Sequence, residues 1–268
     1  MGYVGPVRIA TWNVNSVRSR IDRVAAFLER SDVDVLAIQE TKCREDQFPA
    51  LPLHELGYEV AHFGVNQWNG VAIVSRVGLD DVVRSFADQP EFGDPAILEP
   101  RAIAATCGGI RMWSLYVPNG RTVLDPHYTY KLAWLAALRK DATAWLAADP
   151  DAQIALTGDW NIAPTDEDVW DMAAFEGATH ITALEREAFA TFADTDFIDV
   201  VRPHAPGPGV YTFWDYQQLR FPKRQGMRID FVLASPKLAQ RVSGASIDRE
   251  ERKGKGASDH APVIVDLD

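Results

Sequence analysis

Short apolar runs of strand length recur along the whole chain and limit what it can fold into. Each run is five to eight residues long and is bounded by turn-forming or polar residues, which is typical of β-strands. Gly108 and Gly109 separate two of these runs and indicate a tight hairpin, so the strands are at least partly antiparallel. The eight runs are Val7–Val14, Val33–Ile38, Val71–Ser75, Arg101–Cys107, Ile110–Val117, Gln153–Thr157, Ile229–Ala234 and Pro262–Leu267.

Helical patterns lie between these runs. Arg18–Glu29 and Tyr128–Ala147 carry apolar residues at helical spacing, and a third helix is expected at about Leu184–Phe192. The chain has 268 residues, of which 47% are hydrophobic, enough for a large core. No Pro/Gly-rich linker divides it, and we interpret Pro203–Gly209 as a loop. We predict one domain, 1–268, with an α/β fold of two stacked sheets and helices outside.

The sequence favours a soluble, cytoplasmic protein. It contains no apolar run of the eighteen or more residues that a membrane span needs, and its N-terminus lacks the features of a secretion signal. Cys43 and Cys107 stand alone, with no metal-ligand spacing around them. We therefore expect buried free thiols, no membrane partner and no zinc site.

Charge is unevenly distributed along the chain. The formal net charge of −11 argues against a nucleic-acid partner at first sight, because phosphate binding normally needs a basic surface. Residues 141–199 hold fourteen acidic residues and one basic residue, whereas 216–256 hold ten basic residues and four acidic ones. This difference predicts one basic face on an acidic protein, although each single cation also fits an ordinary solvated charge.

Polar side chains stand at the ends of many of the predicted strands. Asp159 and Asn161 are two residues apart, so a strand would project them from the same face. Taken alone, this pair also fits an ordinary turn. Six such coincidences are harder to attribute to turns: Asn13 and Asn15, Gln39 and Glu40, Tyr116 and Asn119, Asp159 and Asn161, Arg228 and Asp230, and Asp259 and His260.

The chemistry of this set points to phosphoesters. Several carboxylates with asparagine and no cysteine form a hard-oxygen site suited to Mg²⁺, with Mn²⁺ tolerated. Magnesium is held by one or two carboxylates together with phosphate oxygens of the substrate. The chain has neither a phosphate-binding loop ending in Gly-Lys-Ser/Thr nor a Gly-x-Ser-x-Gly elbow, which disfavours P-loop NTPases and serine hydrolases.

A series of motifs in this order resembles the exonuclease III class of apurinic/apyrimidinic (AP) endonucleases, within the endonuclease/exonuclease/phosphatase superfamily. The motifs are TWNVNSVR, QETK, YVPNG, GDWNIAP, YTFWDY, RIDFVLAS and SDHAPV. The resemblance implies a four-layered α/β/β/α sandwich of two mixed, largely antiparallel sheets. It also implies double-stranded DNA with abasic sites or recessed or blocked 3′ ends as the partner, and we expect a monomer.

The resemblance also implies roles for the residues at the strand ends. Glu40 would be the main Mg²⁺ ligand, with Asn13 and Asp259 in the metal shell. Asp159 would orient and deprotonate the attacking water. Asn161 would hold that water or a phosphate oxygen. His260, paired with Asp230, would face the scissile phosphate. Tyr116 would assist the leaving oxygen.

Substrate binding is implied for a further set of residues. An apolar pocket would accept a flipped deoxyribose that carries no base and exclude one that does. Its predicted members are Phe213, Trp214, Met227 and Ile229. Phosphate contacts are assigned to Asn119, Arg220, Lys223, Arg224 and Arg228.

Two alternatives remain open from the sequence. The chain could be another enzyme of the same superfamily that acts on RNA or on a small phosphoester. It could also be an inactive nucleic-acid-binding scaffold, although no expected catalytic position carries an inert residue. Cleavage of an abasic duplex, compared with an inositol phosphate, distinguishes these hypotheses.

Overall fold

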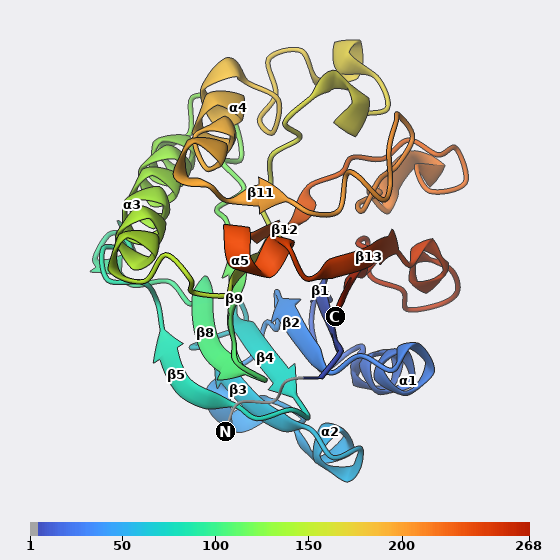
Figure 1. Ribbon diagram of the computed structural model, residues 1–268. Coiled ribbons are helices and arrows are strands. Elements are labelled where there is room, and N and C mark those ends of the chain that lie inside the picture. Colours follow the sequence, from blue (N-terminus) through green and yellow to red (C-terminus); the bar gives the residue numbers. More distant parts are fainter. Residues whose placement is uncertain (1–4) are drawn as a thin grey trace.

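Two six-stranded sheets face each other and carry helices on both outer sides in the computed structural model, which describes residues 5–268 (Figure 1). The first sheet contains, in spatial order, β13 (Val242–Ile247), β14 (Val263–Leu267), β1 (Val7–Asn13), β2 (Val35–Gln39), β4 (Val71–Ser75) and β3 (Glu59–Phe63). The second contains β11 (Ile198–Asp199), β12 (Asp230–Ala234), β10 (Ile154–Asp159), β9 (Ile110–Tyr116), β8 (Ala102–Cys107) and β5 (Asp80–Arg84). A small hairpin pairs β6 (Phe92–Gly93) with β7 (Ala96–Ile97).

The sheets are mixed and largely antiparallel. β1 pairs with β2 in parallel, and β10 pairs with β9 in parallel. The other strand pairs of the described residues are antiparallel. The predicted hairpin is present, because β8 and β9 pair up to Cys107 and Ile110 around Gly108 and Gly109. The predicted α/β/β/α sandwich is therefore confirmed.

The helices form the two outer layers. They are α1 (Ile21–Ser31), α2 (Leu51–Glu55), α3 (Pro126–Ala148), α4 (Ala183–Ala190) and the short α5 (Pro236–Ala239). Figure 1 shows α1 and α2 outside the first sheet and α3 and α4 outside the second. Short 3₁₀ turns occur at Glu45–Gln47, Asp166–Asp168, Met172–Phe175, Ala193–Thr195, Gln217–Leu219 and Arg249–Arg252.

Each interface between layers has its own apolar cluster. The cluster between the sheets includes Ile9, Val35, Ile73, Met112, Val232 and Val265. On the outer face of the first sheet, Trp12 packs with Phe27 of α1 and Leu53 of α2. On the outer face of the second, Phe231 packs with Trp134 of α3. Burial on both faces makes the central strands rigid supports for the polar residues at their ends.

Helix starts differ by a few residues from the prediction. α1 begins at Ile21, three residues later than predicted, with Arg20 as its N-cap residue and no side-chain cap. α3 begins at Pro126, two residues earlier than predicted, because the side chain of Asp125 accepts a hydrogen bond from the backbone N–H of His127. Capping chemistry thus determines where α3 starts.

Several strands carry no apolar pattern and were not predicted. β5 is exposed at all of its positions, β13 is rich in small residues, and β3 alternates only partly. All three lie at the edges of the sheets. They exist because a neighbouring strand offers hydrogen-bonding groups, a signal that the side chains do not carry.

Two further expectations concern the burial of the cysteines and the length of the apolar helices. Cys43 and Cys107 are free and buried, as predicted. Within residues 5–268, no helix combines the length and the apolarity that crossing a membrane would require.

Candidate active site

Strand pairing brings the polar strand ends together at one rim of the sandwich. Asn13 ends β1 and Glu40 follows β2, its parallel neighbour. In the second sheet, Asp159 at the end of β10 lies opposite Tyr116 on one side and Asp230 on the other. Parallel and antiparallel partners therefore place five residues from distant parts of the chain at one edge.

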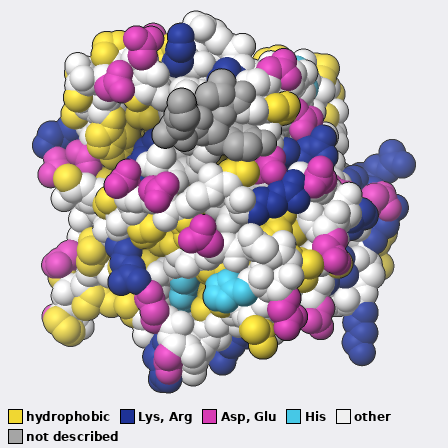
Figure 2. Space-filling view, turned by 60° about the horizontal axis from the view of Figure 1, so that its bottom comes forward, with side chains coloured by type: hydrophobic (Ala, Val, Ile, Leu, Met, Phe, Trp, Pro, Cys, Tyr) yellow, Lys and Arg dark blue, Asp and Glu magenta, His cyan; other side chains and the backbone are white. Residues whose placement is uncertain are grey.

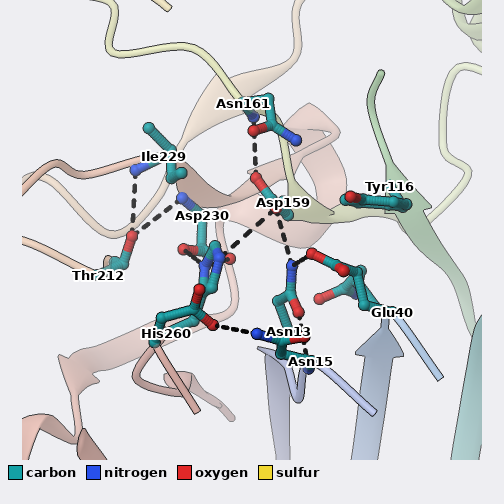
Figure 3. Close-up of polar contacts among 12 residues, drawn as sticks. Asn13, Asn15, Glu40, Tyr116, Asp159, Asn161, Thr212, Ile229, Asp230 and His260 are labelled. Carbon is teal, nitrogen blue, oxygen red and sulfur yellow. Dashed lines mark hydrogen bonds and ion pairs between the residues drawn. The ribbon is translucent and has the colours of Figure 1, made fainter. Parts of the chain in front are cut away.

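Asn13 joins the two sheets (Figure 3). Its amide nitrogen donates to Glu40 Oε1 at 2.8 Å and to Asp159 Oδ2 at 2.9 Å, while its oxygen accepts from the backbone N–H of Asn15. In this arrangement Asn13 presents N–H groups to the two carboxylates. Its side-chain oxygen faces the backbone of Asn15, so Asn13 links the two carboxylates here, and its role as a metal ligand stays a prediction.

Asp259 lies beside this group and not inside it. Within the described residues, Glu40, Asp159 and His260 each offer one ligand atom, and these atoms lie within 4.8 Å of one another. Asp259 lines the same cavity but accepts a hydrogen bond from the side chain of Asn15 at 3.0 Å. The structure brings Asp259 to the site without joining it to this cluster.

His260 and Asp230 form the expected pair. His260 Nδ1 lies 2.8 Å and 3.1 Å from the two carboxylate oxygens of Asp230, and His260 Nε2 lies 3.8 Å from Asp159 Oδ2. Burial alone would lower the pKa of His260, but the carboxylates of Asp230 and Asp159 outweigh burial and raise this pKa to about 10. The imidazole is therefore a cation at neutral pH.

The pKa values of Asp159 and Glu40 are shifted in opposite directions. Burial raises the pKa of Asp159 to about 7, and the carboxylates of Asp230 and Glu40 add to the rise. Burial would also raise the pKa of Glu40, but the Lys42 ammonium, 2.7 Å from Glu40 Oε2, lowers it below its ordinary value. One carboxylate can therefore exchange a proton near neutral pH, whereas the other stays ionised.

Tyr116 keeps its proton. Burial raises the pKa of its phenol well above 10, and the carboxylate of Glu40 adds to this rise. The guanidinium of Arg101 lies 4.9 Å from the centre of the Tyr116 ring and holds it in place. The phenol is thus a hydrogen-bond donor at the edge of the cavity.

Asn161 reaches the site differently from what the strand pattern suggested. β10 ends at Asp159, and Asn161 has a left-handed backbone with φ of 51°. Its backbone N–H donates to Asp159 Oδ1 at 2.9 Å, and its side chain donates to the carbonyl of Val117. A turn after the strand, rather than the strand itself, places Asn161 beside the cavity.

A cavity of about 430 Å³ opens next to this cluster. Glu40, Asp159 and His260 line its polar end, and its apolar wall contains Trp170, Phe175, Phe213, Met227 and Ile229. Trp214 is not part of the wall, because it is buried in a separate cluster with Tyr211 and Ala261. The predicted pocket is therefore present, with Trp170 and Phe175 in place of Trp214.

Arg228 does not face the cavity. It is 3% exposed and donates to Asp168 at 2.6 Å and Asp199 at 2.5 Å, so the structure does not bring Arg228 to the cavity with the other predicted substrate contacts. Its guanidinium belongs to a buried ion-pair network. A one-dimensional charge count could not reveal this, because both acidic partners lie far away in the sequence.

Three other predicted phosphate contacts, Arg220, Lys223 and Arg224, lie on a loop at the mouth of the cavity. Arg220 lines the cavity and stacks on Trp170 at 4.9 Å, while Lys223 and Arg224 are exposed. Arg252 packs on Phe221 instead of facing solvent. Away from this loop, the face seen in Figure 2 mixes acidic and basic side chains. Some of the basic residues in this part of the sequence therefore pack against other side chains, as Arg252 does, and others, such as Lys223 and Arg224, are exposed to solvent.

A buried ion pair that the sequence interpretation missed supports the site. Lys131 of α3 is fully buried and donates to Glu185 Oε1 of α4 at 2.5 Å and to the backbone carbonyl of Asn161 at 2.6 Å. It also donates to the carbonyl of Asn119 at 3.3 Å. A lysine on the apolar face of a predicted helix was the signal that could have revealed it.

His180 was also missed. Its ring lies 3.2 Å from both side chains of Asn119 and Asn161, and it lines the cavity. Burial, together with the Lys131 ammonium, lowers the pKa of His180 to about 4. Nothing in the local sequence marks this residue, because its backbone is an irregular turn.

The donor set suits a hard divalent cation. Two carboxylates, from Glu40 and Asp159, face each other with no thiolate nearby, a combination that favours Mg²⁺ over zinc or copper. The carboxylates around His260 raise its pKa, which favours the protonated ring and leaves the two carboxylates as the better ligands. The remaining coordination positions would belong to water and to phosphate oxygens of the substrate.

His127 predicts a sensitivity of the fold to acid. Its Nδ1 faces the N–H of Gly120 at 3.0 Å and its Nε2 faces Arg101 at 3.4 Å, and burial followed by the Arg101 charge lowers its pKa to about 4. Its unfolded pKa is about 6.5, so between pH 6.5 and 4 the unfolded chain binds a proton that the folded chain does not. This contribution to stability is present above pH 6.5 and is lost as pH falls toward 4.

A variant isolates this effect. The loss of unfolding free energy from pH 7 to pH 5 should be smaller in His127→Gln than in the parent, by about 2 kcal/mol. Urea denaturation at the two pH values measures it. Equal losses in the two proteins would show that His127 already titrates normally in the fold.

Comparisons with known proteins agree with this geometry. The sequence profile of the endonuclease/exonuclease/phosphatase family matches residues 10–260. The chain belongs to this family. Within it, the chain falls with the exonuclease III class of DNA repair hydrolases.

Three relatives show how close the similarity is. The chain is 27% identical over 273 residues to exodeoxyribonuclease III of Haemophilus influenzae, which covers 97% of this chain and 100% of the relative. It is 35% identical to NExo, a 3′ phosphatase from Neisseria solved with a product DNA hairpin, with a TM-score of 0.91 and coverage of 98% and 99%. An AP endonuclease from Archaeoglobus fulgidus is 34% identical, with a TM-score of 0.89 and the same coverage.

Proposed function

We propose that this protein is a Mg²⁺-dependent DNA phosphodiesterase that cuts the backbone 5′ to abasic sites and removes blocking groups from 3′ ends. The observation that carries the proposal is the meeting of Asp159, Glu40 and His260 at the polar end of a cavity whose other wall is apolar. We further propose that residues 1–268 act as one catalytic domain, as a monomer in the cytoplasm.

Each side chain has a part in hydrolysis. Asp159, with a pKa near 7, accepts a proton from the attacking water. The imidazolium of His260 stabilises the charge that grows on the phosphate, and Asp230 holds that ring in place. Tyr116 donates a proton or a hydrogen bond toward the leaving oxygen.

Glu40 would hold the metal ion, together with Asp159 or water. A bound divalent ion supplies Lewis-acid stabilisation of phosphate oxygens. The Lys42 ammonium, hydrogen-bonded to Asn15 as well as paired with Glu40, keeps the Glu40 carboxylate ionised in readiness. Asn13 holds Glu40 and Asp159 at a constant separation.

The apolar wall supports recognition of a sugar without a base. Phe213 packs against the His260 ring at 4.9 Å, and Met227 and Ile229 continue the wall. A flipped deoxyribose fits against such a surface, and flipping costs least where base pairing is already lost. Arg220, at the mouth, would contact the backbone.

Relatives of nearly equal similarity differ in their reaction. One is a 3′ phosphatase and another is an AP endonuclease. Both reactions attack a phosphorus atom bound to a deoxyribose oxygen, so one site can serve both. The test therefore needs two substrates, a duplex with one abasic site and a nicked duplex with a 3′-phosphate, each labelled at its 5′ end.

Metal removal is the first test. We expect a chelator to stop both reactions and added Mg²⁺ to restore them, with Mn²⁺ also effective. Glu40→Ala should lower the rate on the order of a thousandfold, because a bound metal contributes several kcal/mol to the transition state. The products are read on a denaturing gel. Undiminished cleavage in the chelator would exclude the metal mechanism.

A further inference from the structure

A second cavity lies behind the wall that Tyr116 forms in the active site. Its volume is about 330 Å³, within the range of roughly 300–1,000 Å³ that is usual for ligand sites. It is lined by Val65, Asn66, Trp68, Asn69, Ile97, Glu99, Pro100, Arg101, Arg121 and His127. We call it the Trp68 cavity.

Trp68 is the unusual member of this set. Its side chain is 64% exposed, whereas the other seven tryptophans are buried or half-buried. Among residues 5–268, no ring stacks on it and no cation lies over it. A large aromatic surface left in water costs free energy, so a ligand that covers it would bind favourably.

The loop that carries Trp68 is held in place before any ligand arrives. Asn66 Oδ1 accepts from the Trp68 backbone N–H at 2.8 Å, and Asn69 donates to Glu99 Oε1 at 3.0 Å. The carbonyl of Asn69 accepts from the backbone N–H of Lys42, two residues after Glu40. Because these bonds fix the loop, stacking on Trp68 would need little further ordering.

The Trp68 cavity is linked to the active site by two stacked side chains. Arg101 lines the Trp68 cavity and lies 4.9 Å from the centre of the Tyr116 ring, and Tyr116 in turn lines the active-site cavity. Glu99 connects Arg101, at 2.6 Å, to the Trp68 loop. These contacts make the two cavities neighbours, linked through Arg101 and Tyr116.

The charge and polarity of the lining fit a nucleotide. Arg121 has a 61% exposed side chain and only a distant ion-pair contact, 3.7 Å, with Asp125, so it is free to meet a phosphate. Ile97 and Val65 extend the apolar surface beside Trp68. Asn66 and Glu99 add amide and carboxylate groups to the lining.

We propose that the Trp68 cavity binds one unpaired nucleobase of the DNA strand next to the bond that is cut, stacked on the Trp68 ring. This inference rests on the proposed function, because it takes the ligand to be the same strand whose phosphate lies at Asp159. The subsite would favour substrates whose neighbouring nucleotide is frayed or mismatched over fully paired ones.

A fluorescent base tests the subsite directly. The Asp159→Asn full-length chain is used because it is expected to bind nicked duplexes and to cut them slowly, and 2-aminopurine is placed unpaired at each of three positions around the 3′ end. Stacking quenches its fluorescence, so we expect strong quenching at one position only. Trp68→Ala, combined with Asp159→Asn, should abolish that quenching and weaken binding of this duplex on the order of tenfold.

Matched variants separate stacking from structure. Trp68→Phe keeps an aromatic face and should retain most of the quenching. Leu124→Ala removes an apolar side chain that is 93% exposed but does not line the Trp68 cavity, and it should change nothing. An unchanged melting temperature in each variant shows that the loop is intact.

The outcomes are distinct. Quenching that is the same at all three positions, or that survives in Trp68→Ala, would overturn the subsite while leaving the proposed function intact. Failure of every duplex to bind would overturn both. Quenching at one position that is lost in Trp68→Ala but kept in Trp68→Phe and Leu124→Ala supports the assignment.

Discussion

Asp159→Asn is expected to reduce cleavage of an abasic duplex by roughly 10²–10⁴-fold, the contribution of a positioned general base. Asparagine has nearly the same shape but cannot accept the proton from water. It also cannot keep both hydrogen bonds of the carboxylate, to Asn13 and to the backbone of Asn161, because one oxygen becomes an N–H donor. The loss should appear in the single-turnover rate at saturating enzyme.

DNA binding should survive this change. Removing one negative charge from a cavity that must hold a phosphate leaves affinity unchanged or higher. Fluorescence anisotropy at constant salt measures it, since phosphate contacts make affinity strongly salt-dependent. Asp46→Asn, at an exposed carboxylate paired only with Arg44, is the control and should cleave normally. Cleavage within tenfold of the parent in Asp159→Asn would refute the assigned role.

Lys131→Met is expected to lower the free energy of unfolding by about 3–5 kcal/mol, because it leaves the carboxylate of Glu185 buried without its cation. Both side chains are fully buried. The same change removes the donor that holds the backbone carbonyls of Asn119 and Asn161, so cleavage should fall in the fraction of protein that remains folded. Urea denaturation and kinetics at low temperature give the two values separately.

Two further variants separate the loss of stability from the loss of cleavage. Lys140→Met breaks an exposed ion pair with Asp88 and should lower stability far less than Lys131→Met, because water screens the exposed pair. Replacing both members of the buried pair, by Lys131→Met and Glu185→Leu, should recover part of the stability because no charge stays buried alone. If activity returned together with stability, Lys131 would have no positioning role toward the two asparagines.

The amino-acid sequence determined which residues can do chemistry and the general kind of fold. Short apolar runs with a Gly108–Gly109 hairpin predicted stacked, at least partly antiparallel sheets, because run length and turn chemistry are local properties. The polar residues at strand ends predicted a single site because a strand end is a rigid place to hold a side chain. Glu40, Asp159 and His260 were all found in this way.

Only the tertiary structure decided which neighbours each side chain has. Arg228 was predicted from the sequence to contact a phosphate, but in the structure its guanidinium pairs with Asp168 and Asp199, which are distant in the sequence. Trp214, predicted to line the pocket, is buried in a separate cluster, and Trp170 lines the pocket, because burial depends on what packs from other segments. Edge strands, the Lys131 pair and the exposure of Trp68 share this cause: hydrogen bonding and burial are relations between distant segments, and no local pattern records them.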